Sequence, residues 1–492
     1  MEPIVELTAG KVRGRSTDGV TAFLGIPYAE APTGSAAFAA PVRLAPWEGV
    51  RDATTQGATA PQPPYDPPFD QLLSNPLHDG PEFLNVNVWT PGGSGLPVMV
   101  WLPGGAFRNG SNAVPTYDGS AFARDGVVLV SVNYRLGVQG FGVVENSPDN
   151  RGLLDQLAAL AWVQENIARF GGDPDRVTLF GQSAGGMSVA TLLSIPASRG
   201  LFQRAIVQSG TAQAVAIATE ATFATAEVAK RLGVEASAAG LGSVPLTELI
   251  ATQGAVASEM RQNPDAGRWG PSVVTAGGGI MPFFPVIDGE LIHERPIDAI
   301  AKGASQGIDL MVGTTTEEFR LFTIPTGLAA AITAEALPVL TARMGLPPAI
   351  AETYAANRPG LSPGEVLAAI TSDAFFGVPT MRLAEAHQDA TFAYEFDWRT
   401  PVGGLGACHA LELPFVFDTL GGSGSTALTG PDAPQELADR MHAAWVAFAT
   451  SGDPGWPQYD TASRAVMTFD QPSSRVIENP RANEYALWVG VG

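Results

Sequence analysis

Short apolar runs that are hydrophobic on both faces are the feature that most limits how this chain can fold. The runs are PVMVWL (97–102), GVVLVSVNY (126–134) and RVTLFG (176–181). Strands with this composition are typical of a largely parallel sheet that helices cover on both sides. Between the last two runs, LLDQLAALAWVQENIARFG (153–171) repeats its apolar residues at helical spacing, so the order strand, helix, strand predicts a βαβ crossover. The chain is predicted to be an α/β protein.

Further strand and helix patterns extend this prediction along the chain. Strand-like runs are VNVW (86–89), VIDGELI (286–292), DLMVGT (309–314) and FAYEFDW (392–398), and ELADRMHAAWVAFATSG (436–452) predicts a late helix that ends at a glycine.

Residues 211–390 carry mostly helical patterns. We expect a single α/β body over 1–492, with its catalytic core mainly in 80–210, 280–320 and 390–492. PQPPYDPPFD (61–70) cannot be a helix or a central strand, because its prolines lack amide donors and fix φ. The loop 61–80 and the insertion 211–390 are expected to shape a pocket.

The composition argues against several classes of partner. The chain has 49 acidic and 28 basic residues, a net charge of -21, which repels phosphate backbones and anionic membrane surfaces. Its one cysteine, Cys408, cannot form an internal disulfide or a thiol zinc cluster. Without a signal-peptide pattern or an apolar run of about 18 residues, we expect a cytoplasmic protein with no membrane or nucleic-acid partner. A removed leader and the oligomeric state stay open.

GQSAGG (181–186) lies where the strand RVTLF passes abruptly into the helical pattern MSVATLLS. This is the context of a nucleophile elbow, in which a strained serine projects its hydroxyl above the sheet. Gly181 and Gly185 would allow the close approach of strand and helix, and the amide of Ala184 would face the same space as Ser183. The alternative is a glycine-rich turn with an idle serine.

Two other serines lie near the elbow. Ser188 falls within the helix that follows, and Ser209, in the turn IVQSG, is expected to satisfy buried backbone groups.

A second glycine-rich turn suits an elbow. PVMVWLPGGAF (97–107) is a strand that ends in Pro103, Gly104, Gly105 and Ala106. Two glycines let backbone N–H groups turn toward a developing oxyanion, where loss of one donor costs about a hundredfold in rate. A plain strand-ending turn is the alternative.

Motifs along most of the chain resemble the type B carboxylesterases of the carboxylesterase and cholinesterase family, in particular the bacterial para-nitrobenzyl esterase branch. Besides the two turns, they are FLGIPYAEAP (23–32), FLNVNVWTP (83–91), SVNYRLGVQGF (131–141), GTTTEEF (313–319) and GACHALELPFVF (406–417). The resemblance implies an α/β-hydrolase fold: a mostly parallel central sheet flanked by helices, with a helical insertion forming the wall of an active-site gorge.

The resemblance also implies a Ser-Glu-His triad in that chain order. Ser183 matches the nucleophile, Glu318 the acid and His409 the general base, while Glu317 is the alternative to Glu318. The oxyanion amides would belong to Gly105, Ala106 and Ala184. No metal and no organic cofactor is implied.

The chain holds only five histidines, and four of them lack the glycine-rich loop after a strand that surrounds His409. They are His78, His293, His387 and His442. The last two lie in helical patterns, where a partly exposed histidine needs no role.

The chain departs from the family pattern at three positions. Gln182 stands where the family usually has a glutamate, so a carboxylate that could favour an imidazolium or a cationic substrate is absent. Pro103 replaces an aromatic residue or a histidine, which is compatible with a strand that ends there. Phe83 stands where many relatives have a cysteine.

The implied function is hydrolysis of carboxylic esters, short- to medium-chain or aryl, through an acyl-enzyme. Cleavage of amides or carbamates by the same triad, and a non-catalytic binding module of the cholinesterase type, are the alternatives. Several phenylalanines near the motif loops could line an acyl or alcohol pocket or belong to the core. They are Phe107, Phe283, Phe284, Phe319, Phe322, Phe375 and Phe376.

Overall fold

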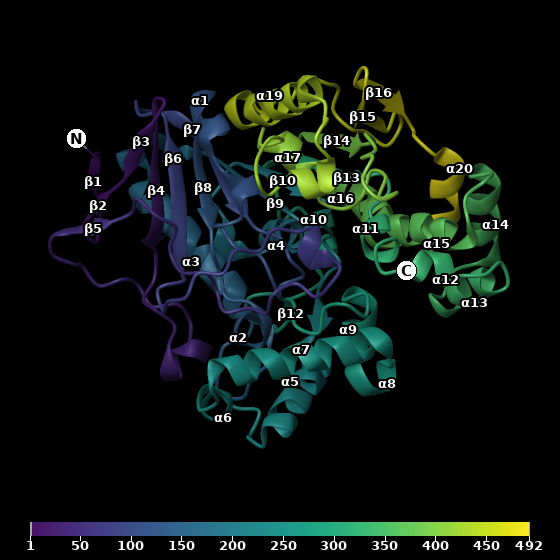
Figure 1. Cartoon of the computed structure of the whole chain (residues 1–492), viewed down its shortest axis with the longest axis horizontal. Helices are drawn as coiled ribbons and strands as arrows, with labels where there is room; N and C mark the ends of the chain where they lie inside the picture. Colours follow the sequence, from purple (N-terminus) through teal and green to yellow (C-terminus); the bar gives the residue numbers. More distant parts are fainter. Residues whose placement is uncertain (1, 492) are drawn as a thin grey trace.

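The central feature is a twisted sheet that runs across the molecule (Figure 1). The computed structural model describes residues 2–491, and within them this sheet is 11-stranded. In spatial order its strands are β16 (Arg475–Glu478), β15 (Ala465–Phe469), β14 (Thr391–Phe396), β13 (Asp309–Thr315), β10 (Arg204–Gln208), β9 (Gly172–Gln182), β7 (Leu96–Leu102), β8 (Val128–Val132), β6 (Asn85–Thr90), β4 (Val20–Pro27) and β3 (Arg15–Thr17).

Most of the sheet is parallel. Every neighbouring pair from β8 to β15 is parallel, whereas the pairs β3 with β4, β4 with β6, β6 with β8, and β15 with β16 are antiparallel. The predicted fold class, an α/β-hydrolase fold with a mostly parallel sheet, is confirmed. Two small sheets lie outside it: β1 (Ile4–Glu6), β2 (Lys11–Arg13) and β5 (Val50–Asp52), and the pair β11 (Ala216–Ile217) and β12 (Val286–Ile287).

Helices cover the sheet and fill the segment between β10 and β14. In Figure 1, α5 to α9 gather below the sheet and α12 to α15 lie at the right with α20. The helices are α1 (Ser120–Arg124), α2 (Gly137–Phe141), α3 (Arg151–Asn166), α4 (Ala184–Leu192), α5 (Ala218–Leu232), α6 (Ala238–Gly242), α7 (Leu246–Gln262), α8 (Ala266–Trp269), α9 (Pro271–Ala276), α10 (Pro296–Ala301), α11 (Arg320–Thr323), α12 (Leu328–Ala331), α13 (Ala336–Arg343), α14 (Pro348–Asn357), α15 (Pro363–Ser372), α16 (Val378–Ala386), α17 (Leu413–Val416), α18 (Thr426–Thr429), α19 (Gln435–Ser451) and α20 (Ala482–Tyr485). Across residues 2–491, none combines the length and the hydropathy that crossing a bilayer requires.

Most strands that the sequence predicts are present, but the run 286–292 is an exception. Only Val286 and Ile287 are extended, and they pair with β11 rather than joining the large sheet. The carboxylate of Asp288 accepts hydrogen bonds from three following amides, the last of them that of Ile292, which folds the chain into a turn. Gly289, at φ +77°, completes that turn. A local side-chain hydrogen bond therefore outcompetes strand pairing.

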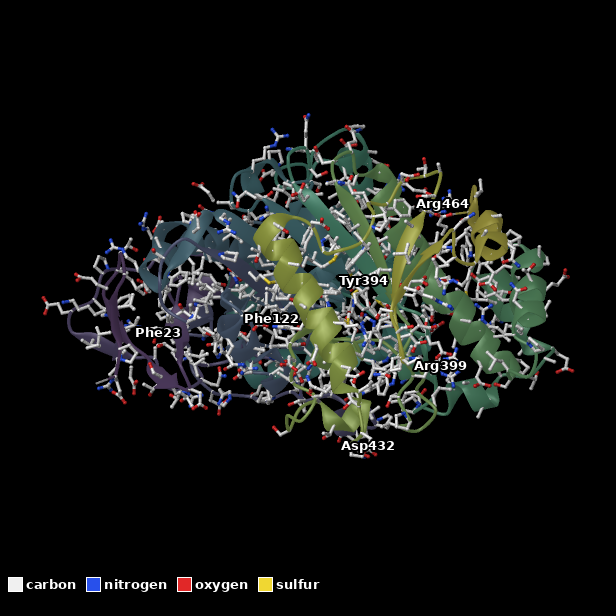
Figure 2. The ribbon with its side chains drawn as sticks, turned by 90° about the horizontal axis from the view of Figure 1, so that it is seen from above. Phe23, Phe122, Tyr394, Arg399, Asp432 and Arg464 are labelled. Atoms are coloured by element: carbon white, nitrogen blue, oxygen red, sulfur yellow. The ribbon has the colours of Figure 1, made fainter. Side chains whose placement is uncertain are left out.

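Strand β7 shows how the apolar runs build two cores. Because successive side chains of a strand point to opposite faces, Val98 and Val100 pack into one apolar cluster and Met99 and Trp101 into the other. The Trp101 ring lies 4.8 Å from that of Phe180, measured between centroids. Seen from above, α19 crosses this second face between Phe122 and Tyr394 (Figure 2). Both faces of the strand are therefore buried, as its composition predicts.

Replacing Trp101 with alanine should lower the free energy of unfolding by about 3–5 kcal/mol, because the large fully buried ring would leave a cavity. Urea unfolding followed by circular dichroism measures this change. A loss below about 1 kcal/mol would show that the second core tolerates this cavity.

The direction of the parallel strands fixes where a site can lie. Strands β7, β9, β13 and β14 run the same way, so their carboxyl ends meet at one edge of the sheet. The predicted oxyanion loop follows β7, Ser183 follows β9, Glu318 follows β13 and His409 lies in the loop after β14. The topology therefore delivers all four segments to the same edge.

Candidate active site

Ser183 lies in a sharp turn between β9 and α4. Its backbone has φ 56° and ψ −125°, a strained conformation for a residue with a side chain. The amide of Ser183 donates to the carbonyl of Gln208, and its own carbonyl accepts from the amide of Met187, in the first turn of α4. These bonds hold the serine in the strained turn that the sequence motif predicts.

Glycine is required on both sides of the serine. A Cβ added to Gly185 would lie 1.9 Å from the carbonyl oxygen of Leu102, and one added to Gly181 would lie 2.6 Å from the Gly185 backbone. The elbow therefore packs directly on the end of β7.

Replacing Gly185 with alanine should destabilise the fold by about 3 kcal/mol, because a methyl group cannot fit against the Leu102 carbonyl. The matched control is Gly254→Ala in α7, where nothing lies within 4 Å of the added Cβ. That control should gain about 0.5–1 kcal/mol from the better helix former. Equal urea midpoints for both variants would contradict the close approach.

The loop after β7 lies against the elbow. A Cβ on Gly104 would be 3.1 Å from Cβ of Ser183, and Gly105, at φ +125°, approaches the Asn109 carbonyl so closely that a side chain cannot fit. Ala106 is also left-handed, at φ 55°. Among residues 2–491, the amides of Gly105 and Ala106 have no hydrogen-bond acceptor, and a first helical amide such as that of Ala184 has no acceptor within its own helix.

The proline-rich loop 61–70 forms hydrogen bonds with the turn after β7. The side-chain amide of Gln62 donates to the carbonyl of Gly110 over 3.0 Å and accepts from the Gly110 amide over 2.8 Å. The side-chain amide of Asn109 donates to the carbonyl of Pro63. The irregular segment predicted for 61–70 is therefore a scaffold of the turn after β7, with a short 3₁₀ helix at Phe69–Gln71.

Glu318 and His409 come together beneath the edge of the sheet. His409 Nδ1 donates to Oε2 of Glu318, while Oε1 of the same carboxylate accepts from the amide of Thr315 over 3.0 Å. The amide of His409 also donates to the carbonyl of Glu318. Both side chains are buried: His409 is 5% exposed and Glu318 is 1% exposed. The carboxylate therefore fixes both the orientation and the tautomer of the ring.

Glu317, the alternative acid, points elsewhere. Its Oε2 accepts from the amide of Ala407 over 2.9 Å and pairs with Arg399, and its Oε1 lies 3.8 Å from Arg320. It therefore ties down the loop before His409 without touching the imidazole.

The other ring nitrogen of His409 meets the side chain of Gln182, one of the three positions at which the sequence departs from the family pattern. His409 Nε2 lies 3.1 Å from Nε2 of the Gln182 side chain. Within residues 2–491, the hydroxyl of Ser183 forms no hydrogen bond with the ring. The structure thus brings the serine, the histidine and the glutamate to one edge, with the Gln182 amide on the imidazole lone pair.

Aromatic rings enclose the imidazole. The ring of Phe376 lies 4.9 Å and that of Phe322 5.4 Å from the His409 ring, measured between centroids. Phe376 belongs to a π-helical turn, Asp373–Gly377, between α15 and α16. Such turns are frequent at functional sites. Phe319, in contact with Phe322 and Phe376, completes the wall.

The remaining phenylalanines divide between core and wall. Phe107 is fully buried against Phe141, and Phe283 and Phe284 are buried in the core, whereas Phe375 is partly exposed.

A second buried carboxyl group, Glu412, was missed by the sequence analysis. It accepts from Nε2 of Gln208 over 3.3 Å, and its Oε2 has no partner within residues 2–491. Burial and the charge of Glu318 raise the pKa of Glu412 from 4.5 to about 8. Its place three residues after His409 in GACHALELPF was the available signal, but a lone glutamate is usually exposed. Glu412 is therefore a neutral acid at pH 7.

Replacing Glu412 with glutamine should change how stability depends on pH. The unfolded carboxyl ionises near 4.5 and the folded one near 8, so the wild type loses stability as pH rises through that window, about 1.4 kcal/mol per pKa unit. Glutamine cannot ionise, so the melting temperatures should be similar at pH 5 and higher for the variant at pH 8. Parallel melting curves at every pH would contradict the raised pKa of Glu412.

The other candidate serines and histidines lie outside this arrangement. Ser188 is buried in α4 and accepts from Gln156. Ser209 was expected to satisfy buried backbone groups, but its hydroxyl has no partner within residues 2–491, and its backbone lies in the left-handed region at φ 45°. His387 and His442 are buried rather than partly exposed: they contact Thr391 and Val416, and burial lowers the pKa of His387. His78 and His293 are exposed.

Cys408 is fully buried in the second core, where burial and the charge of Glu318 raise the pKa of its thiol well above the usual range. It is a packed residue, as the sequence analysis expected.

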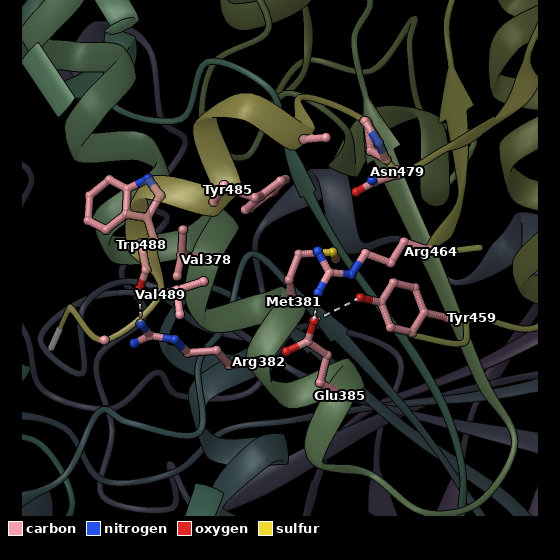
Figure 3. A pocket seen from close by; sticks show the side chains of 14 residues that line it. Val378, Met381, Arg382, Glu385, Tyr459, Arg464, Asn479, Tyr485, Trp488 and Val489 are labelled. Atoms are coloured by element: carbon pink, nitrogen blue, oxygen red, sulfur yellow. Dashed lines mark hydrogen bonds and ion pairs between the residues drawn. The ribbon is translucent and has the colours of Figure 1, made fainter. Parts of the chain in front are cut away.

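A cavity of about 510 Å³ lies between α16 and the C-terminal segment (Figure 3). Arg464 pairs with Glu385 across it, and Tyr459 donates to the same carboxylate. Neither Ser183 nor His409 lines this cavity. It is therefore separate from the candidate active site.

Comparison with known proteins agrees with this geometry. Residues 1–488 match the model of the carboxylesterase family. The chain belongs to the carboxylesterase family. The predicted enzyme class, a carboxylic ester hydrolase, is confirmed.

Named relatives cover nearly the whole chain. The carboxylesterase is 37% identical to a para-nitrobenzyl esterase of Bacillus subtilis, over 98% of this chain and 97% of the relative. It is 35% identical to a phenmedipham hydrolase of Pseudarthrobacter oxydans, over 96% of each. Among solved structures, a Geobacillus stearothermophilus carboxylesterase superposes with a TM-score of 0.83 at 34% identity, covering 99% of both chains. The predicted resemblance to the para-nitrobenzyl esterase branch is confirmed.

Proposed function

We propose that this carboxylesterase cleaves its ester through an acyl-enzyme formed on Ser183, with His409 as general base and Glu318 as the acid that orients it. The observation that carries the proposal is the buried hydrogen bond from His409 Nδ1 to Glu318, formed at the sheet edge where the strained Ser183 lies. Because Nδ1 carries the proton, Nε2 is the nitrogen that can accept one.

The reaction has two stages, acylation of the serine and hydrolysis of the acyl-enzyme. Nε2 of His409 accepts the hydroxyl proton as Oγ of Ser183 bonds to the ester carbonyl carbon, and the carbonyl oxygen becomes an oxyanion. When the oxyanion collapses, the bond to the alkoxy oxygen breaks and His409 returns the proton to the leaving alcohol. Water then repeats these steps on the acyl-enzyme and frees the carboxylic acid. Glu318 orients the imidazole and stabilises the imidazolium throughout.

The oxyanion is proposed to bind the amides of Gly105, Ala106 and Ala184. The first two are without acceptors within residues 2–491, and the third begins α4, where the helix dipole favours negative charge. The left-handed backbone of Gly105 and Ala106 supports this role for the first two donors, because it fixes the loop after β7 before substrate arrives.

Short- to medium-chain and aryl esters are the proposed substrates. The wall of Phe319, Phe322 and Phe376 beside His409 suits apolar groups, and the similarity to an enzyme named para-nitrobenzyl esterase supports aryl substituents. We propose a cytoplasmic enzyme that acts as one body, 1–492, on small molecules without nucleic-acid or membrane partners, with 61–80 and 211–390 shaping the pocket.

Replacing Ser183 with alanine should abolish the burst of para-nitrophenol from para-nitrophenyl butyrate and lower kcat by at least about a thousandfold, because the covalent step is lost. The matched control is Ser188→Ala, a serine one turn along α4 that should retain activity. Fluorophosphonate labelling should disappear only in the Ser183 variant.

Wild-type turnover in the Ser183 variant would overturn the acyl-enzyme proposal. Matched ester and amide substrates with one acyl group test reaction preference, and faster cleavage of the amide would overturn the ester assignment.

A further inference from the structure

The side chain of Gln182 occupies an unusual place between two parts of the candidate active site. It is 3% exposed, its Nε2 lies 3.1 Å from His409 Nε2, and its Oε1 faces Gly104, where an added Cβ would lie 3.1 Å away. The amide nitrogen is thus aimed at the imidazole and the amide oxygen at the loop after β7.

The chemistry of this contact depends on the protonation of the ring. Since Nδ1 donates to Glu318, a neutral His409 keeps a lone pair on Nε2, and an amide N–H can donate to it. A protonated Nε2 would instead place an N–H against the Gln182 N–H, and two donors repel. A carboxylate in the same place could only accept, so it would favour the imidazolium.

We propose that Gln182 is a positioning residue that holds the imidazole of His409 neutral, so that hydrolysis extends to lower pH than a glutamate at position 182 would permit. The inference rests on the proposed role of His409 as general base. During acylation the Gln182 amide must give up its hydrogen bond to Nε2, so that Nε2 can accept the proton of the Ser183 hydroxyl.

Apart from Glu318, the titratable groups around the ring contribute little charge, so the residue at position 182 has a large influence on the protonation of His409. Within residues 2–491, the ion pair of the imidazole is with Glu318 alone. Glu412 is neutral at pH 7, and burial likewise raises the pKa of Cys408 and of Tyr394. The aromatic wall carries no charge.

Glu317 is compensated by two arginines, Arg320 and Arg399, at the loop before His409. A carboxylate at position 182 would therefore be a second negative charge beside the imidazole, in addition to Glu318, and would have no arginine of its own to balance it.

The test is Gln182→Glu, with kcat/KM for para-nitrophenyl butyrate measured from pH 5 to 9. Because kcat/KM reports the protonation of the free enzyme, its acidic limb should move to higher pH by about one unit or more. The plateau of kcat/KM above the limb is read separately, because it reports the barrier of the fully active form rather than the protonation of His409. Structural damage would lower the plateau and leave the limb in place.

The control is Gln253→Glu, another buried glutamine, whose Oε1 accepts from the amide of Val138 and which does not contact His409. This variant adds the same charge and should keep the wild-type limb. If the acidic limb of the kcat/KM profile of Gln182→Glu coincides with that of the wild type, the inference is overturned.

If Gln182→Glu fails to fold, Gln182→Met serves instead. It keeps the length but removes the hydrogen bond to the neutral ring, and the limb should rise by about half a unit. A limb that stays or falls overturns the inference. Either result leaves the acyl-enzyme proposal standing, because that proposal fails only if Ser183→Ala retains turnover.

Discussion

The close approach of Gly185 to the Leu102 carbonyl is the constraint on which the site depends. It presses the elbow after β9 onto the end of β7, so Ser183 and the loop of Gly104 and Gly105 become neighbours although they lie about 80 positions apart in the chain. The register of the parallel strands then brings Glu318 and His409 to the same edge. Backbone packing, more than attraction between the polar groups, assembles the site.

The buried acidic groups near His409 carry little net charge. Within residues 2–491, the region around His409 contains two buried glutamates and a buried glutamine, yet the ion pair of the ring is with Glu318, and burial raises the pKa of Glu412 to about 8. Two buried carboxylates so close would repel each other and cost stability. A neutral second acid supplies hydrogen-bonding capacity without that repulsion.

The sequence predicts whatever depends on local pattern or on steric necessity. The two-sided apolar runs predict β7, β8 and β9, and the glycines of GQSAGG predict the elbow. Prediction from the sequence fails where an interaction between side chains far apart in the chain determines the local structure. The buried state of Glu412 and the hydroxyl of Ser209, which lacks a partner within residues 2–491, depend on packing that no local pattern encodes. The family resemblance links position 182 to the imidazole, but the direct contact of Gln182 with His409 depends on the same packing. At 286–292, one carboxylate reverses a strand pattern of apolar residues.

The π-helical turn at Asp373–Gly377 gives two adjacent phenyl rings different surroundings. Phe376 leans on the imidazole, whereas Phe375 reaches Gly278 in the segment between α9 and β12 and remains partly exposed. Phe375 also packs against Phe319, at 5.4 Å between ring centroids, so the two rings belong to one aromatic cluster. A change at position 375 would therefore reach the imidazole only through Phe319 and its neighbours, whereas a change at position 376 would act on it directly.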